Sequence, residues 1–120
     1  MKVDNFMEFV EARIAKCKER ADALERDHRK DEAVFEKVQE NVYDIFRSVW
    51  RVAGQQCGED KAARIQFFQI RLEQIPSSWV DSLEKARQHG DENKALIESL
   101  KLRVIKEITL AFEQYREENT

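Results

Sequence analysis

Residues 25–32 read ERDHRKDE, a stretch of eight residues without a single aliphatic side chain. On both sides of it, apolar residues recur every three or four positions, which is the spacing of an amphipathic helix. The upstream pattern consists of Val3, Met7, Val10, Ile14, Cys17, Ala21 and Leu24. Asp4 or Asn5 is the predicted cap at its start. The fold therefore depends on whether the chain turns within residues 25–32.

Two structures are compatible with this stretch. The apolar spacing stays in phase across it, which would allow one helix of about 50 residues. The order of charges favours a turn, because Arg26 to Lys30 are mostly basic and suit the negative end of a helix, whereas Asp31 and Glu32 suit the positive start of the next. We predict a turn at residues 27–31 and an antiparallel pair of helices. The absence of Gly and Pro here keeps the single long helix open.

The second helix is predicted to bury one apolar face and to end at a glycine. Gly54 and Gly58 are the predicted stop signals. The predicted inner face comprises Phe35, Val38, Val42, Ile45, Val49 and Val52, widened by Val34, Phe46 and Trp50.

A third helix is predicted between Glu59 or Asp60, which can cap its start, and Pro76, which ends it. Its predicted inner face is Ile65, Phe68, Leu72 and Ile75.

Two more helices complete the chain. Ser78 and Asp81 have the spacing of a capping box ahead of a short helix that Gly90 ends. Asp91 and Glu92 open a long final helix. Its predicted inner face is Ile97, Leu100, Val104, Ile105, Ile108, Ala111, Phe112 and Tyr115.

Composition agrees with an all-α fold. Three Gly and one Pro in 120 residues are too few for a turn-rich β-sandwich or barrel. Hydrophobic residues (42%) and charged residues (38%) occur in the mixture that amphipathic helices require. We predict one all-α domain over residues 1–120, a helical bundle. It would combine a long N-terminal helical hairpin (1–57) with a C-terminal unit (58–120) of two short helices and one long helix.

Charge and cysteine content limit the classes of partner. The net charge is −3 with both signs interspersed, which argues against nucleic acid and anionic membranes. No apolar run is long enough to span a bilayer or to act as a secretory signal. Cys17 and Cys57, 40 positions apart, match neither a zinc site nor a disulfide framework. We therefore expect reduced thiols and a cytoplasmic protein.

Catalytic and metal chemistry have little support in the residues. Glu25 and His28 share a helix face, as in carboxylate-bridged metal bundles, but the second pair that such a site needs is missing. Cys17 falls on a predicted buried face, where thiols are usually inert. We expect no catalytic residue, no cofactor and no metal, and keep a small carboxylate/His metalloprotein as the third hypothesis.

Nucleic-acid binding is the second hypothesis. Cations beside an aromatic ring can pair with and stack on a single strand. The residues concerned lie within 47–71 and are Arg47, Arg51, Lys61, Arg64 and Arg71, with Phe67 among them.

The first hypothesis is a non-catalytic interaction or assembly module. Phe67 and Ile70 point away from the inner face of the third helix, and Leu102 and Leu110 point away from that of the last. A small monomer has little interior for both sides of a helix, so these four residues are the candidate interface of a homo-oligomer, most simply a dimer. The alternative is that the helices are sandwiched within one chain.

Overall fold

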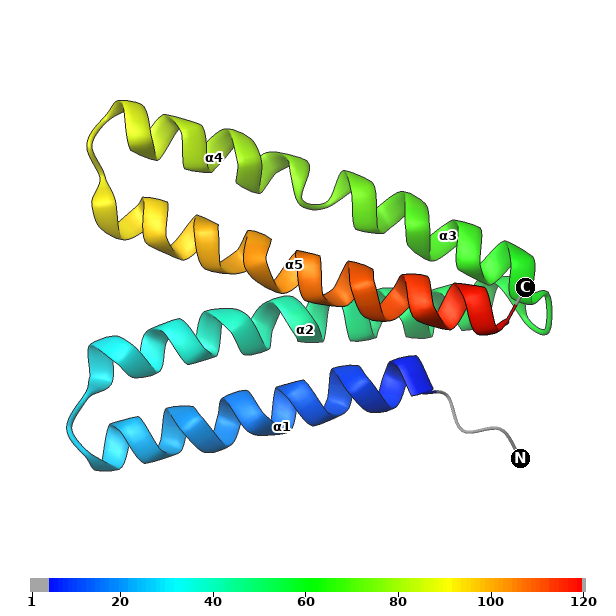
Figure 1. Cartoon of the computed structure of the whole chain (residues 1–120), viewed down its shortest axis with the longest axis horizontal. Helices are drawn as coiled ribbons and strands as arrows, with labels where there is room; N and C mark the ends of the chain where they lie inside the picture. Colours follow the sequence, from blue (N-terminus) through cyan, green and yellow to red (C-terminus); the bar gives the residue numbers. More distant parts are fainter. Residues whose placement is uncertain (1–4, 120) are drawn as a thin grey trace.

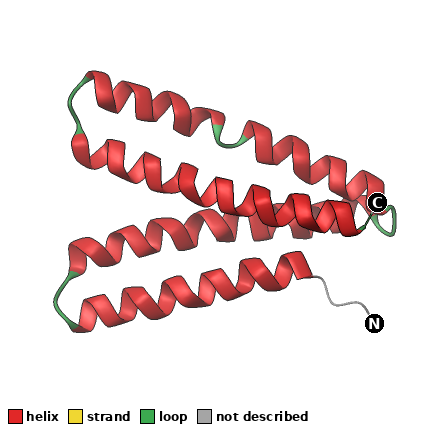
Figure 2. Ribbon diagram, viewed as in Figure 1, coloured by secondary structure: helices red, strands yellow, loops and turns green. Residues whose placement is uncertain are grey.

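The computed structural model describes residues 5–119, which form five α-helices and no β-strand (Figure 1, Figure 2). The helices are α1 (Asn5–Arg26), α2 (Lys30–Cys57), α3 (Lys61–Gln74), α4 (Ser77–Gln88) and α5 (Glu92–Glu118). Helices α3 and α4 run end to end, so the five helices pack as four rods (Figure 1). The predicted all-α helical bundle is confirmed.

The charged stretch at residues 25–32 contains a tight turn. Helix α1 ends at Arg26 and α2 begins at Lys30, so the turn is shorter than predicted by two residues. His28 has a left-handed φ of 60°, which reverses the chain direction. An ion pair between Glu25 and Lys37 joins the two helices next to the turn. The predicted antiparallel pair is confirmed, and the single long helix is excluded.

Most of the predicted helix ends are also confirmed. Asp60 and Asp91 cap α3 and α5, because each carboxylate accepts a hydrogen bond from the backbone N–H three residues later, at 3.0 and 3.1 Å. Gly58 and Gly90 follow α2 and α4 with φ values of 57° and 68°, a conformation that glycine adopts without strain. Asn5 is already helical; Val3 and Asp4 lie outside the described residues.

The prediction that Gly54 helps to end α2 was wrong, because α2 continues through it to Cys57. A Cβ atom at position 54 would lie 3.1 Å from the guanidinium of Arg64. The missing side chain thus leaves room for Arg64 to lie across α2, and the glycine serves packing between α2 and α3 instead of termination.

The predicted capping box at the start of α4 was also wrong. Pro76 has helical angles (φ −71°, ψ −11°), so α4 starts directly after α3. The Ser77 hydroxyl donates to the carbonyl of Gln74 at 2.7 Å, and the Ser78 hydroxyl donates to that of Ile75 at 3.5 Å. The serines therefore satisfy carbonyls at the end of α3, and the amides at the start of α4 receive no side-chain cap.

Aromatic rings fill the centre of the core. The Phe68 ring is fully buried, and its centroid lies 4.6 Å from that of Phe112, 5.2 Å from that of Phe6 and 5.5 Å from that of Trp50. These rings come from α1, α2, α3 and α5, so both predicted halves of the chain share one core. The sequence pattern did not include Phe6, because Met7 fits the upstream spacing better; Met7 is only half-buried.

The inner face of α2 is rotated relative to the predicted one. Val42, Phe46 and Trp50 are buried as expected, and the inner face also includes Ala33, Tyr43 and Ala53, which were not predicted. Val34 and Val52 remain 46% and 39% exposed, and Val38 and Ile45 are half-buried. Apolar periodicity identifies the uncharged side of a helix, but only the positions of its neighbours decide which part of that side is covered.

Candidate functional site

The chain is less compact than a typical monomer of its size. Its dimensions are 45 × 35 × 22 Å, and its radius of gyration is 16.0 Å, whereas about 14 Å is usual for this length. Six large hydrophobic side chains of the described residues stay between 39% and 68% exposed, and they are Val34, Val52, Ile70, Val80, Leu96 and Leu110.

Part of this surface is an uncharged row of side chains along α2, which we call the α2 seam. Neighbouring members are alternately four and three residues apart, so that they share one side of the helix. Val34 and Val52 at its two ends are exposed hydrophobic residues, and Asn41 and Ser48 are exposed polar ones. The α2 seam consists of Val34, Val38, Asn41, Ile45, Ser48 and Val52.

Neighbouring helices cover other parts of α2. Helix α5 meets it where the guanidinium of Arg103 donates to the side-chain oxygen of Gln39 at 3.5 Å, and helix α3 meets it through Arg64. These two hydrogen bonds involve no residue of the α2 seam, although Ile45 of the seam packs against the hydrophobic core. The charged residues of α2 between positions 36 and 51 also fall outside it, and they are Glu36, Lys37, Glu40, Asp44, Arg47 and Arg51.

Helix α5 also has partly uncovered apolar residues where it diverges from α2 toward the two hairpin turns (Figure 1). Leu96 lies two turns before Arg103, the residue that contacts α2, and therefore shares its side of the helix. Leu96 is 46% exposed and Leu100 is half-buried. The apolar sides of α2 and α5 are thus incompletely covered toward these turns.

The four residues predicted as an interface have different environments. The guanidinium of Arg71 lies 3.7 Å from the ring centroid of Phe67, which is half-buried, as is Leu102. Ile70 is 39% exposed and Leu110 is 68% exposed. Leu110 is isolated along α5, since the residues one turn away from it are polar: Lys106, Glu107, Glu113 and Gln114. Compared with these four, the α2 seam is a longer continuous row on one helix.

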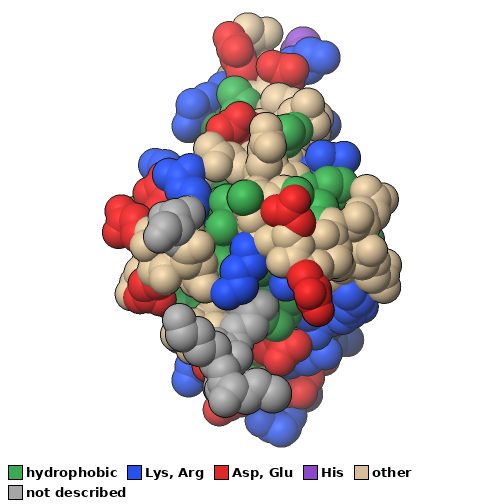
Figure 3. Space-filling view, turned by 90° about the vertical axis from the view of Figure 1, so that its right-hand side faces the viewer, with side chains coloured by type: hydrophobic (Ala, Val, Ile, Leu, Met, Phe, Trp, Pro, Cys, Tyr) green, Lys and Arg blue, Asp and Glu red, His purple; other side chains and the backbone are tan. Residues whose placement is uncertain are grey.

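The cations predicted for nucleic-acid binding are mostly engaged within the chain. Arg64 stacks over the indole of Trp50 at 3.8 Å and donates to the backbone carbonyl of the same residue at 3.1 Å. Arg71 stacks on Phe67, and Arg47 pairs with Asp44. Lys61 and Arg51 are exposed. On the face shown in Figure 3, cationic and anionic side chains alternate and form no large patch of one sign.

Two buried side chains near the contact between α1 and α2, Cys17 and Tyr43, have raised pKa values. Burial, together with the negative charge of Glu36, raises the pKa of the Cys17 thiol from 9.0 to about 11. Burial and a hydrogen bond donated to Glu107 raise the pKa of Tyr43 above its usual value. Both groups are therefore protonated at neutral pH, and Cys17 is a poor nucleophile.

The raised pKa of the Cys17 thiol predicts that the stability of the protein depends on pH. Because its pKa is higher in the folded state, its contribution to the free energy of unfolding is complete below about pH 9 and is lost as the pH rises through about 11. Urea unfolding across this range should show a steeper loss of stability for the wild type than for Cys17→Ala. Both proteins contain Tyr43, so the contribution of that phenol is the same in each and the difference between the two curves isolates the thiol. Parallel curves would contradict this prediction.

The predicted metal-site pair does not come together with further ligands. Glu25 is bound to Lys37, which lowers the pKa of Glu25 through their hydrogen bond, and His28 lies in the turn between the helices. Within residues 5–119, no group of three or more His, Cys, Asp or Glu side chains has a geometry that could hold a metal ion.

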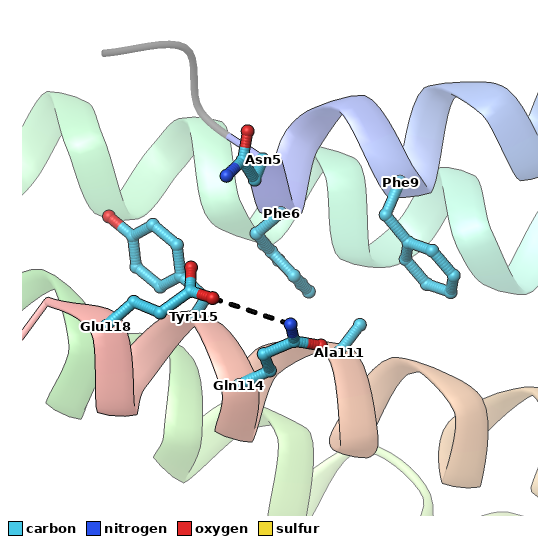
Figure 4. A pocket seen from close by; sticks show the side chains of 7 residues that line it. All are labelled: Asn5, Phe6, Phe9, Ala111, Gln114, Tyr115 and Glu118. Atoms are coloured by element: carbon cyan, nitrogen blue, oxygen red, sulfur yellow. Dashed lines mark hydrogen bonds between the residues drawn. The ribbon is translucent and has the colours of Figure 1, made fainter.

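A small cavity of about 240 Å³ lies between the start of α1 and the end of α5 (Figure 4). Phe6, Phe9 and Tyr115 give it an aromatic wall. The amide of Gln114 at its rim donates to the carboxylate of Glu118 at 3.4 Å. Its described lining contains no cysteine, histidine or serine, so it offers no thiol, no serine hydroxyl and no imidazole base; the other lining residues are Asn5 and Ala111.

None of the helices in the described part of the chain combines the length and the hydropathy of a membrane-spanning segment. Comparisons with protein-family models, with curated proteins and with solved structures gave no match to this chain.

Proposed function

We propose that this protein is a non-catalytic α-helical interaction module that associates with a second copy of itself. The observation that carries the proposal is the set of large hydrophobic side chains that stay 39–68% exposed in the described part of the chain: Val34, Val52, Ile70, Val80, Leu96 and Leu110. A stable interface buries about 800 Å² on each partner.

Burial of exposed apolar side chains would drive the association. Each Val or Leu side chain contributes about 1.5–3 kcal/mol when it passes fully from water into an apolar contact. Val34, Val52 and Leu96 are between 39% and 46% exposed, so each would contribute only part of that amount. Several such residues together are needed to offset the entropy lost when two chains associate.

Light scattering coupled to size-exclusion chromatography tests this proposal. We expect a mass of twice 14.2 kDa at micromolar concentrations and a shift toward the monomer mass on dilution. A mass of 14.2 kDa that persists as the concentration rises would contradict self-association.

A further inference from the structure

We infer that α4 is a segment poised to open: it separates from α5 between two joints, at Pro76 and Gly90, while the other helices stay folded. Opening brings the buried carboxylate of Glu98, on α5, into water. This behaviour belongs to a single chain and does not depend on self-association.

Helix α4 is held by one main neighbour and by few buried side chains. It packs against α5, on the outside of the bundle (Figure 1). Leu83 and Ala86 are its buried residues, and neither belongs to the aromatic core that joins the other four helices. Trp79, near the start of α4, is half-buried and packs against the edge of that core. Segments with few buried apolar contacts open at a lower free energy than the whole protein, so α4 is the helix that we expect to open first.

Both ends of α4 are joints in the backbone. Pro76 has no N–H, so the hydrogen bond that would continue α3 into α4 at this position is missing. The first amides of α4 receive no side-chain cap, because the hydroxyls of Ser77 and Ser78 donate to carbonyls at the end of α3. At the other end, Gly90 has a φ of 68° and separates α4 from α5. The regular hydrogen bonding of α4 is therefore interrupted at both joints.

The closed segment buries a carboxylate that is only half satisfied. Glu98 is 6% exposed. One of its oxygens accepts a hydrogen bond from the ammonium of Lys101 at 3.2 Å, and the other is buried without a hydrogen-bond partner in the described part of the chain. Burying a carboxylate oxygen without a partner costs free energy, because water would otherwise hydrate it.

Helix α4 is the element that covers this carboxylate. Lys101 follows Glu98 by three residues and shares its side of α5. The Lys101 ammonium lies 5.4 Å from the ring centroid of Trp79 on α4. Leu96, on the side of α5 toward α2, lies roughly 160° around the helix from Glu98. Hydration of Glu98 therefore favours the open state, whereas burial of the α4 side chains favours the closed one.

Native-state hydrogen exchange followed by NMR tests this inference on the intact chain. We expect the backbone amides at positions 82–88 to exchange through one common opening, at least about tenfold faster than the amides at positions 42–50 of α2. Fraying from the ends would instead give protection that rises steadily toward the middle of α4. Such a gradient, or equal exchange in α4 and α2, would contradict a segment that opens as a unit.

Glu98→Met tests the role of the carboxylate. Methionine has a similar length and no charge, and replacing a buried ion pair by apolar side chains is often stabilising, so exchange in α4 should slow at least about fivefold. The side chain of Lys101 is 25% exposed, so its ammonium keeps access to water when its partner is removed. Glu113→Met is the matched control, since Glu113 is an exposed glutamate of α5, and it should leave exchange in α4 unchanged. Unchanged or faster exchange in Glu98→Met would overturn the role of Glu98.

Ile14→Val separates the opening of α4 from unfolding of the whole chain. Ile14 is buried in the core on α1 and stays buried when α4 opens. The shorter side chain should speed the exchange of the slowest α2 amides by about two- to tenfold and leave that of α4 unchanged. An equal acceleration in α4 would show that α4 opens only when the whole chain unfolds, and would overturn the inference. All variants are compared at one protein concentration, and the mass measured by light scattering tests self-association separately.

Discussion

Phe68→Ala is expected to lower the free energy of unfolding by about 3–5 kcal/mol, the usual cost of removing a buried phenylalanine ring. The Phe68 ring is fully buried, and four other rings surround it with centroids between 4.6 and 5.9 Å away. These four rings come from three other helices, α1, α2 and α5, so the structure cannot close around the cavity by moving a single side chain. Since small domains are stable by only about 5–15 kcal/mol, thermal unfolding should shift by many degrees.

Phe67→Ala is the matched control, because the same substitution is made one residue earlier on α3. Phe67 is half-buried and stacks mainly with Arg71 at the surface, so its loss creates little internal cavity. We expect less than half the effect of Phe68→Ala in the same urea titration. Equal losses of stability for the two variants would mean that the aromatic cluster does not lie where the structure places it.

Arg64→Ala is expected to destabilise the protein by about 2 kcal/mol, a large effect for an arginine. The guanidinium lies 3.8 Å from the indole centroid of Trp50 and donates a hydrogen bond to the Trp50 carbonyl. Trp50 is fully buried, so the stacking occurs partly out of water, where the attraction between a cation and an aromatic ring is strongest. Gly54 keeps the space for this arrangement.

Arg71→Ala provides the comparison for Arg64→Ala. Arg71 stacks on Phe67 at 3.7 Å, nearly the same distance, but its aromatic partner is half exposed to solvent. We expect a loss of about 0.5–1 kcal/mol, the range for exposed pairs of this kind. A double-mutant cycle of Arg64→Ala with Trp50→Phe measures the coupling directly. A coupling energy near zero would show that the indole of Trp50 adds nothing to the stabilisation by Arg64 beyond what a phenyl ring gives.

Local signals in the sequence were sufficient for most of the helix boundaries. The acidic residues Asp60 and Asp91 cap the helices that follow them, and Gly58 ends the helix that precedes it. The order of basic and acidic residues around His28 correctly predicted a turn without any Gly or Pro. These features depend on interactions within a few residues along the chain, which is why they can be recognised without knowledge of the fold.

The serines after Pro76 show where local reasoning failed. Ser78 and Asp81 have the spacing of a capping box, but a capping box requires an extended residue before the helix. Pro76 is compatible with helical angles as well as with extended ones, and here it is helical. The choice goes with the end-to-end arrangement of α3 and α4 along α5, which the spacing of Ser78 and Asp81 does not encode (Figure 1).

Which apolar residues stay exposed also depends on the tertiary packing. Sequence patterns established that several helices carry more apolar surface than a single face requires, and they placed the excess at Phe67, Ile70, Leu102 and Leu110. In the folded chain, Arg71 stacks on Phe67, whereas Val34 and Val52, predicted to be internal, are exposed. The α2 seam became visible only once the positions of α1, α3 and α5 around α2 were known.

The amino-acid order was therefore enough to specify the helical class, the hairpin turn and most caps, because each follows from backbone hydrogen bonding and charge within one or two helical turns. Packing of distant segments was needed to select Phe6 over Met7 for the core and to leave Val34 and Val52 exposed. Periodicity gives the direction of an apolar side chain relative to its own helix axis, whereas burial depends on which other helix lies in that direction.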